Sequence, residues 1–271
     1  ITPLNSHRFM FGTDDRHPHD LINEGHINFL LKKAVKLGLD PIIAIQMATI
    51  NPCMHFRFRR MGAIAPGYFA DIVIFDNLKN FNISTVIKDG KVVATNEKLT
   101  VSVKTKAPVI RSSINVKWLH KEDISIKAPD NSLQNNKSDR LKLNVIEIIP
   151  NQIITKKVQC PALIDENNCI ISDISKDILK IVVVERHLAT GNIGIGFVKG
   201  FGLKKGAIAG SIAHDSHNII AVGANDDDIY NAIIKIIKLG GGLAVIEDGK
   251  TLAELELPIA GLMSNKPLEF V

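Results

Sequence analysis

The chain carries a dense group of carboxylates and imidazoles at residues 14–20, directly after an apolar stretch at residues 8–12. Aspartate supplies a hard oxygen ligand or a proton acceptor, and histidine supplies an imidazole nitrogen for metal binding or proton transfer. Arg8 apart, the apolar stretch predicts a buried strand with reactive residues at its carboxyl end, an arrangement typical of (β/α)₈ barrel enzymes. A helix start is the alternative, because Asp and Pro are common at the first positions of helices.

A second polar group, His214–Asn218, combines two imidazoles, a carboxylate and a hydroxyl just before an apolar stretch. Ser/His/Asp catalysis is disfavoured here, since the members of a catalytic triad come from distant positions. A metal site would need further ligands, which Glu185 and His187 could supply. A hydrogen-bond network that fixes the turn into the following strand is the structural alternative.

Two other features carry little chemistry. The glycine-rich segment at 191–196 has neither a Gly-x-Gly-x-x-Gly order before a helix nor a Gly-Lys-Ser/Thr sequence, so turns and close backbone packing explain the glycines at 191–210 better. The three cysteines, Cys53, Cys160 and Cys169, form no Cys-x-x-Cys pair. That spacing excludes a zinc ribbon and argues for a reducing compartment without a disulfide framework.

Composition argues against nucleic-acid and membrane proteins. Of the 271 residues, 45% are hydrophobic, as in an ordinary globular protein. The net charge of +5 comes from scattered basic residues with few aromatic residues beside them, so we expect no nucleic-acid partner. No apolar run approaches the roughly 18 residues that span a bilayer, and no signal-peptide pattern opens the chain, so we expect no membrane contact.

Periodicity predicts helices and then strands in the first part of the chain. An amphipathic helix is expected at 20–37 and a second at 40–49, with Asp40 as its N-cap and Pro41 at its first position. A short helix at 53–58 and a β run at 68–75 follow. Residues 86–93 should form a hairpin, because Asp89-Gly90 is a strong two-residue turn signal.

The rest of the chain has α+β character after a polar loop at about 128–140, whose residues 131–138 are the most loop-like. Strands are expected at 141–149, 178–185 and 218–222. Asn225 should cap a helix at 226–239, since its acidic first turn favours the helix dipole. A hairpin around Asp248-Gly249 should join residues 243–247 and 251–255.

Several of these stretches resemble the adenine deaminases of the amidohydrolase superfamily. The first group is GTDDRHPHDLINEGHI (12–27), MATINP (47–52) and GAIAPGYFADIVIFDNL (62–78), and many amidohydrolases share it. The second group is ERHLATGNIGIGFVKGFGLKKGAIAGSIAHDSHNIIAVGAND (185–226) and LPIAGLMS (257–264), which is similar to the C-terminal domain peculiar to bacterial-type members and is far more specific. Together the resemblance spans nearly the whole chain.

The resemblance implies a fold and a reaction. Residues 1–60 would be the last strand and helices of a metal-dependent (β/α)₈ barrel, 61–97 part of a small β-sandwich, and 98–271 the C-terminal α+β domain. The reaction would be hydrolysis of adenine to hypoxanthine and ammonia by water activated on a divalent metal, Mn²⁺ or Fe²⁺ with Zn²⁺ as the alternative. We expect a cytoplasmic homo-oligomer.

The opening of the chain at Ile1, without Met, fits that resemblance. One strand cannot build a barrel, so the chain is expected to be the C-terminal part of a longer enzyme. Its missing N-terminal part would hold most barrel strands and metal ligands, and the chain alone would be inactive.

The resemblance also implies roles for particular residues. The family's acid at the tip of the eighth barrel strand, which matches Asp14, ligates the metal or takes a proton from the metal-bound water. Asp15 would contact the substrate or support the metal ligands, with a salt bridge to Arg16 as the alternative. The remaining candidates for substrate contact or support of the site are His17, His19, His214 and His217. His17 and His19 could instead be polar residues of a helix start, and His26 is expected to be a packed or partly exposed helix histidine.

On this interpretation the His214–His217 loop closes the pocket over the purine at the barrel mouth. Two other functions remain open. One is another amidohydrolase, which cuts a cyclic amide or deaminates a different heterocycle, although the second group of motifs argues against it. The other is an inactive fragment, or a subunit that binds a partner barrel.

Overall fold

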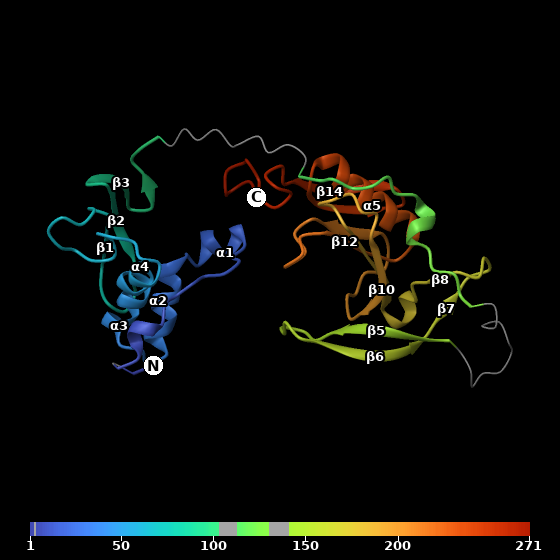
Figure 1. Cartoon of the computed structure of the whole chain (residues 1–271), viewed down its shortest axis with the longest axis horizontal. Helices are drawn as coiled ribbons and strands as arrows, with labels where there is room; N and C mark the ends of the chain where they lie inside the picture. The colour runs from blue at the N-terminus through green and yellow to red at the C-terminus, as the bar shows by residue number, and fades with distance from the viewer. Residues whose placement is uncertain (3, 103–112, 130–140) are drawn as a thin grey trace. The chain divides into compact units, whose positions relative to one another are not determined.

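The computed structural model describes residues 1–2, 4–102, 113–129 and 141–271 (Figure 1). The chain divides into two compact units, one of Ile1–Lys106 with Leu268–Phe270, the other of Ala107–Pro267 with Val271. The predicted polar loop at 131–138 lies outside the described residues. Within the described residues, no helix is long and apolar enough to cross a membrane.

The first unit begins with helices. They are a 3₁₀ turn at Ser6–Arg8, α1 (Pro18–Asn23), α2 (Ile27–Lys36), α3 (Pro41–Ala48) and α4 (Ile50–His55). The prediction of one helix at 20–37 is wrong, because α1 ends before Gly25, whose φ of 102° is outside the helical region. Residues with a side chain rarely adopt this φ, so the break favours glycine.

The predicted second helix is confirmed as α3, and it starts as expected. The Asp40 carboxylate accepts hydrogen bonds from the backbone N–H groups of Ile42 and Ile43, at 2.9 and 3.0 Å. Helix α4 starts earlier than predicted and includes Asn51. Thr49 separates α3 from α4.

A sheet in the order β1-β2-β3-β4 completes the first unit. Its strands are β1 (Ile72–Phe75), β2 (Ile83–Lys88), β3 (Lys91–Thr95) and β4 (Lys98–Leu99). The predicted hairpin is confirmed between β2 and β3, where Asp89 and Gly90 both have positive φ values, 50° and 75°. Two central residues with positive φ match the twist of paired strands. The predicted β run at 68–75 is shorter than expected, since only its second half is strand.

The second unit is built on an eight-stranded sheet. In spatial order its strands are β14 (Lys250–Glu256), β13 (Gly242–Glu247), β11 (Ala207–Gly210), β12 (Ile219–Gly223), β9 (Ile178–Val184), β10 (Ile193–Lys199), β5 (Lys142–Ile148) and β6 (Thr155–Pro161). Strands β5 and β10 pair in parallel, whereas the other neighbours pair antiparallel. The short strands β7 (Leu163–Ile164) and β8 (Ile170–Ile171) form a separate pair.

Helix α5 (Asp226–Leu239) covers one face of this sheet and forms its main core (Figure 1). Ile229, Ile233 and Ile236 are fully buried against small residues of β11, β12 and β13. The predicted helix is confirmed: Asn225 accepts a hydrogen bond from Asp228 N at 2.8 Å, and Gly240 ends the helix in the left-handed conformation. The hairpin around Asp248-Gly249 is likewise confirmed as β13–β14.

The prediction of turns and close packing for the glycines at 191–210 is confirmed at Gly191, Gly200, Gly202 and Gly206, which have positive φ, whereas residues 193–199 and 207–210 form strands β10 and β11. Strand β10 pairs with β9 along its whole length, and Gly194 and Gly196 lie opposite Val183 and Ile181. A Cβ at Gly196 would be in ordinary contact with Ile181, 3.6 Å away, so the strand has room for a side chain at this position. Cross-strand neighbours with bulky side chains supply the packing that glycine lacks.

The predicted buried strand at 8–12 is also wrong. Phe9 is extended but exposed, and residues 9–12 form no strand in the described part of the chain. A strand is stabilised by hydrogen bonds to a neighbouring strand, whereas Phe11 N donates instead to Met47 O of α3, at 3.0 Å. The structure thus confirms a mixed α and β architecture, and the barrel remains an expectation.

Candidate functional site

Asp14, the strongest candidate, lies in the irregular segment between residue 9 and α1. Its side chain is exposed, and its φ of 51° places it in the left-handed region. A non-glycine residue rarely adopts this conformation, although Asp tolerates it better than most. Such outliers are found at functional sites more often than elsewhere, which motivates a test of this residue.

The segment that leads to Asp14 is held by Asn51, a residue that the sequence analysis did not select. The buried Asn51 amide donates to Ser6 O at 2.9 Å and to Phe9 O at 2.8 Å. Both acceptors precede Asp14 in the same segment, so Asn51 fixes its path. An amide inside an otherwise apolar helical stretch, next to Pro52, was the available signal.

Arg16, two residues after Asp14, connects this segment to α2 and to the residue that follows α1. Its guanidinium forms an ion pair with Glu24 and lies over the Phe29 ring, 4.5 Å from the centroid. The side chain is only 11% exposed. Arg16 therefore pairs with Glu24, and the role of Asp15 remains a prediction.

The histidines of this region fall into different environments. His17 is the exposed N-cap of α1 and makes no side-chain cap bond. His19 lies within α1, where its Nδ1 is 3.0 Å from the Asn23 amide nitrogen. His26 precedes α2 and is exposed, and its Nε2 lies 3.1 Å from the hydroxyl of Thr13, the neighbour of Asp14. His26 is thus closer to the candidate site than the sequence suggested.

A complete metal centre is absent from the described ranges, in which no group of three or more His, Cys, Asp or Glu side chains could hold an ion. Asp14 offers an exposed hard oxygen donor of the kind a divalent metal takes. The donor set present here fits at most one or two ligands of a site that generally needs about three or more from the protein.

Glu185 of the second unit is not a free ligand. Its carboxylate accepts hydrogen bonds from the backbone N–H groups of Thr190, Leu188 and His187, and from the Thr190 hydroxyl. The backbone donors, Thr190 first, lower the pKa of Glu185 to about 2. Glu185 therefore organises the turn after β9, which argues against its proposed part in a metal site.

The His214–His217 loop is bonded to this turn. His187 Nε2 lies 2.9 Å from Ser216 O, and the His214 and His217 rings meet edge to face with centroids 5.0 Å apart. His217 is half-buried with a φ of 52°. Two enclosed atoms, His217 Nδ1 and Asn218 Oδ1, have no hydrogen-bond partner within the described residues. An enclosed polar atom without a partner costs about 1–3 kcal/mol, which a bound polar group would offset.

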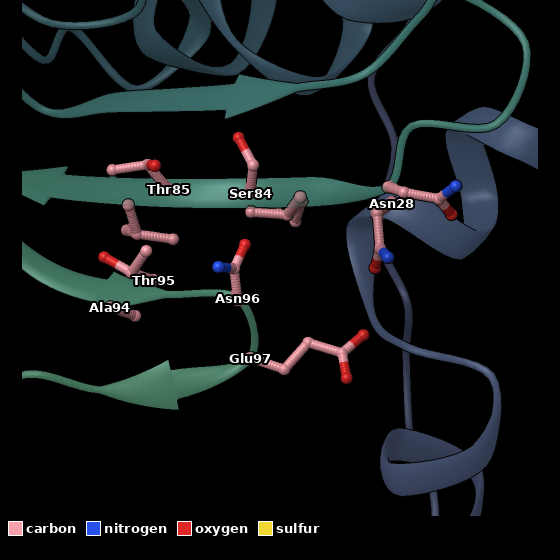
Figure 2. A pocket seen from close by; sticks show the side chains of 10 residues that line it. Asn28, Ser84, Thr85, Ala94, Thr95, Asn96 and Glu97 are labelled. Carbon is pink, nitrogen blue, oxygen red and sulfur yellow. The ribbon is translucent and has the colours of Figure 1, made fainter.

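Two hollows among the described residues contain none of the predicted site residues. The first, about 260 Å³, lies on β2 and β3 beside Asn28, as Figure 2 shows. The second, about 560 Å³, lies in the second unit beside Lys117, Trp118 and His120.

Comparison with known proteins places this arrangement in a class. Residues 3–93 match the amidohydrolase family, and residues 152–271 match the adenine deaminase C-terminal domain. The resemblance drawn from the motifs is confirmed: along its whole length the chain is similar to the C-terminal portion of adenine deaminases.

Individual relatives agree. Adenine deaminase from Dehalococcoides mccartyi (strain ATCC BAA-2266 / KCTC 15142 / 195) is 44% identical over 274 residues, which are 100% of this chain and 46% of that protein. Adenine deaminase 2 from Carboxydothermus hydrogenoformans is 45% identical over 262 residues, 96% of this chain and 44% of that protein. Adenine deaminase from Thermosipho africanus is 45% identical over 271 residues, 100% of this chain and 45% of that protein. The chain thus spans less than half the length of these relatives.

Proposed function

We propose that this chain is the C-terminal part of an adenine deaminase that hydrolyses adenine to hypoxanthine and ammonia. The observation that carries the proposal is the agreement of two separate regions, because the amidohydrolase match and the adenine deaminase C-terminal match lie in order on one chain. The second match makes an amidohydrolase of other specificity the weaker alternative. We further propose that the enzyme serves purine salvage in the cytoplasm as a homo-oligomer.

In this proposal the family's divalent metal, Mn²⁺ or Fe²⁺ with Zn²⁺ as the alternative, supplies water made acidic enough to ionise near neutral pH. Asp14 would hold that metal or accept the proton of the water, and then deliver a proton to the departing ammonia. An exposed carboxylate suits either role, and Asn51 holds the chain five residues earlier, at the Phe9 carbonyl. The other metal ligands would come from the barrel part outside this chain.

The neighbouring residues would handle the substrate. Asp15, His17 and His19 follow Asp14 directly and would line the pocket mouth. His214 and His217 would reach that mouth from the second unit and help to close it over the purine. The enclosed Nδ1 of His217 and Oδ1 of Asn218, which have no partner within the described residues, support this role, because a bound base offers both hydrogen-bond donors and acceptors.

The decisive experiment uses the intact enzyme with its barrel part. Asp14→Asn should keep its fold and lose most turnover of adenine, measured as ammonia released, while Asp15→Asn loses much less. Glu166→Gln changes an exposed carboxylate of the second unit and serves as the control. An unchanged rate in Asp14→Asn would refute its assignment, and failure of the wild-type enzyme to deaminate adenine would refute the function.

The role of the histidine loop has its own test. His217→Ala should change KM or kcat for adenine at least several-fold while the metal content, measured by elemental analysis, stays constant. Kinetic constants equal to those of the wild type would return the loop to a purely structural role.

A further inference from the structure

Arg186 is a buried cation just after β9, and the sequence analysis did not select it. Arg186 is only 2% exposed. The guanidinium donates hydrogen bonds to four backbone carbonyls in three segments, those of Ser113, of Ser211 and His217, and of Ala260. The bonds from Nη2 to Ala260 O and Ser211 O are 3.1 and 3.5 Å long.

The surroundings are shaped to this guanidinium. Gly261 approaches it so closely that a Cβ there would lie 2.9 Å from Nη1, and its φ of 71° also favours glycine. Ser211 is fully buried and joins the neighbouring segments, because its hydroxyl donates to Gly261 O and accepts from Gly242 N at 2.8 Å. Burial lowers the pKa of Arg186, which is the expected effect on a cation whose partners are neutral carbonyls.

The acceptors show what the guanidinium connects. His217 and Ser211 flank the histidine loop, and Ala260 lies in the segment 257–264. These are the same stretches that carry the specific resemblance. Removal of the guanidinium would release both ends of the loop at once. Its bonded partners are all neutral carbonyls, so its removal would leave no carboxylate without a counter-charge among them.

We infer that Arg186 is a positioning residue, which holds the His214–His217 loop in the conformation that the intact enzyme uses on its substrate. The inference rests on the proposed function. A purely structural staple would need only to stabilise the domain. The tethered loop, however, keeps His217 Nδ1 and Asn218 Oδ1 enclosed without partners in the described structure, an arrangement that favours a ligand rather than stability.

The test compares two buried cations, one on β9 and one just after it, in the intact enzyme. Arg186→Gln removes the tether, and Arg186→Lys keeps the charge but cannot bond all four carbonyls with one ammonium. Lys180→Gln is the matched control, because Lys180 is fully buried on β9 and pairs with Asp226 at 2.6 Å, away from the histidine loop. Thermal unfolding, metal content, kcat, KM and amide hydrogen exchange at residues 211–218 are measured for each.

Arg186→Gln should lower kcat/KM for adenine about 10- to 100-fold relative to Lys180→Gln at a similar loss of Tm, with unchanged metal content. Exchange at the His217 amide should accelerate in Arg186→Gln alone, and Arg186→Lys should fall between it and the wild type. Where Arg186→Gln does not fold, Arg186→Lys takes its place.

Equal kinetics and equal exchange in the Arg186 and Lys180 variants would overturn the inference. Faster exchange without a kinetic change would also overturn it, since the loop conformation would then not matter to the reaction. A wild-type enzyme inactive on adenine would instead overturn the proposed function, and the exchange comparison would still decide whether Arg186 holds the loop.

Discussion

Replacement of Asn51 by alanine should destabilise the segment that carries Asp14. Neither acceptor would be left bare by this change. Ser6 O still accepts from Phe9 N at 3.0 Å, and the carbonyl of exposed Phe9 could bond water. A net hydrogen bond contributes about 0.5–1.5 kcal/mol. Loss of two such bonds in Asn51→Ala should therefore lower the unfolding free energy by about 1–3 kcal/mol.

Urea unfolding of the 271-residue chain measures this cost. Far-UV circular dichroism follows the whole chain, while fluorescence of the single tryptophan, Trp118, follows the second unit. The circular dichroism transition should shift in Asn51→Ala. Asn51→Asp should cost more, because a carboxylate cannot donate to the two carbonyls and repels them.

Asn23→Ala is the matched control, since this exposed amide donates to His19 O of its own helix. Its unfolding free energy should stay within about 0.5 kcal/mol of the wild type. Asn51→Ala within the same margin would refute the reasoning, because the path of the segment would then not depend on the amide.

Three further predictions follow from the described contacts. Glu185→Gln should remove a stabilising carboxylate whose pKa is lowered from 4.5 to about 2 by backbone N–H donors. The stability advantage of the wild type, measured by urea unfolding, should thus be full above pH 4.5 and disappear as the pH falls towards 2; a difference independent of pH would contradict this. Asn225→Ala should cost about 1 kcal/mol by loss of the α5 cap, measured by thermal unfolding, with the exposed Asn167→Ala near zero as its control. The metal-loaded 271-residue chain alone should not deaminate adenine, because the described residues hold no complete metal site; robust activity would refute this.

The parts of the fold that the sequence predicted are those with local signals. Helix α5 has its cap, its acidic first turn and its terminal glycine within one stretch of chain. The hairpins at Asp89-Gly90 and Asp248-Gly249 are also encoded by adjacent residues. Such signals need no knowledge of what lies across the molecule.

The errors arise at one local break and at two places where distant contacts decide the structure. Apolar periodicity continued through Gly25, although its positive φ ends the helix there. The apolar stretch at 8–12 had strand-like composition but donates to α3 instead of a neighbouring strand. Strand β10 was missed because its glycines give no β signal, and its partner β9 supplies the bulky side chains.

The residues of the candidate site also differ in whether the sequence alone indicates them. The residues proposed to act on the substrate, such as Asp14 and His217, are recognisable by type and by motif, whereas Asn51 and Arg186 bond backbone carbonyls of distant segments. Every residue has a backbone carbonyl, so the sequence does not indicate which carbonyls Asn51 and Arg186 bond.

This difference allows chemistry and positioning to be separated by experiment. A substitution at exposed Asp14 removes a reactive group and should leave the unfolding free energy nearly unchanged. Substitutions at buried Asn51 or Arg186 leave every reactive group in place and should lower stability and turnover together. If Asp14→Asn and Asn51→Ala reduced turnover equally while only Asn51→Ala reduced stability, the rate would depend on where the segment holds its carboxylate as much as on the carboxylate itself.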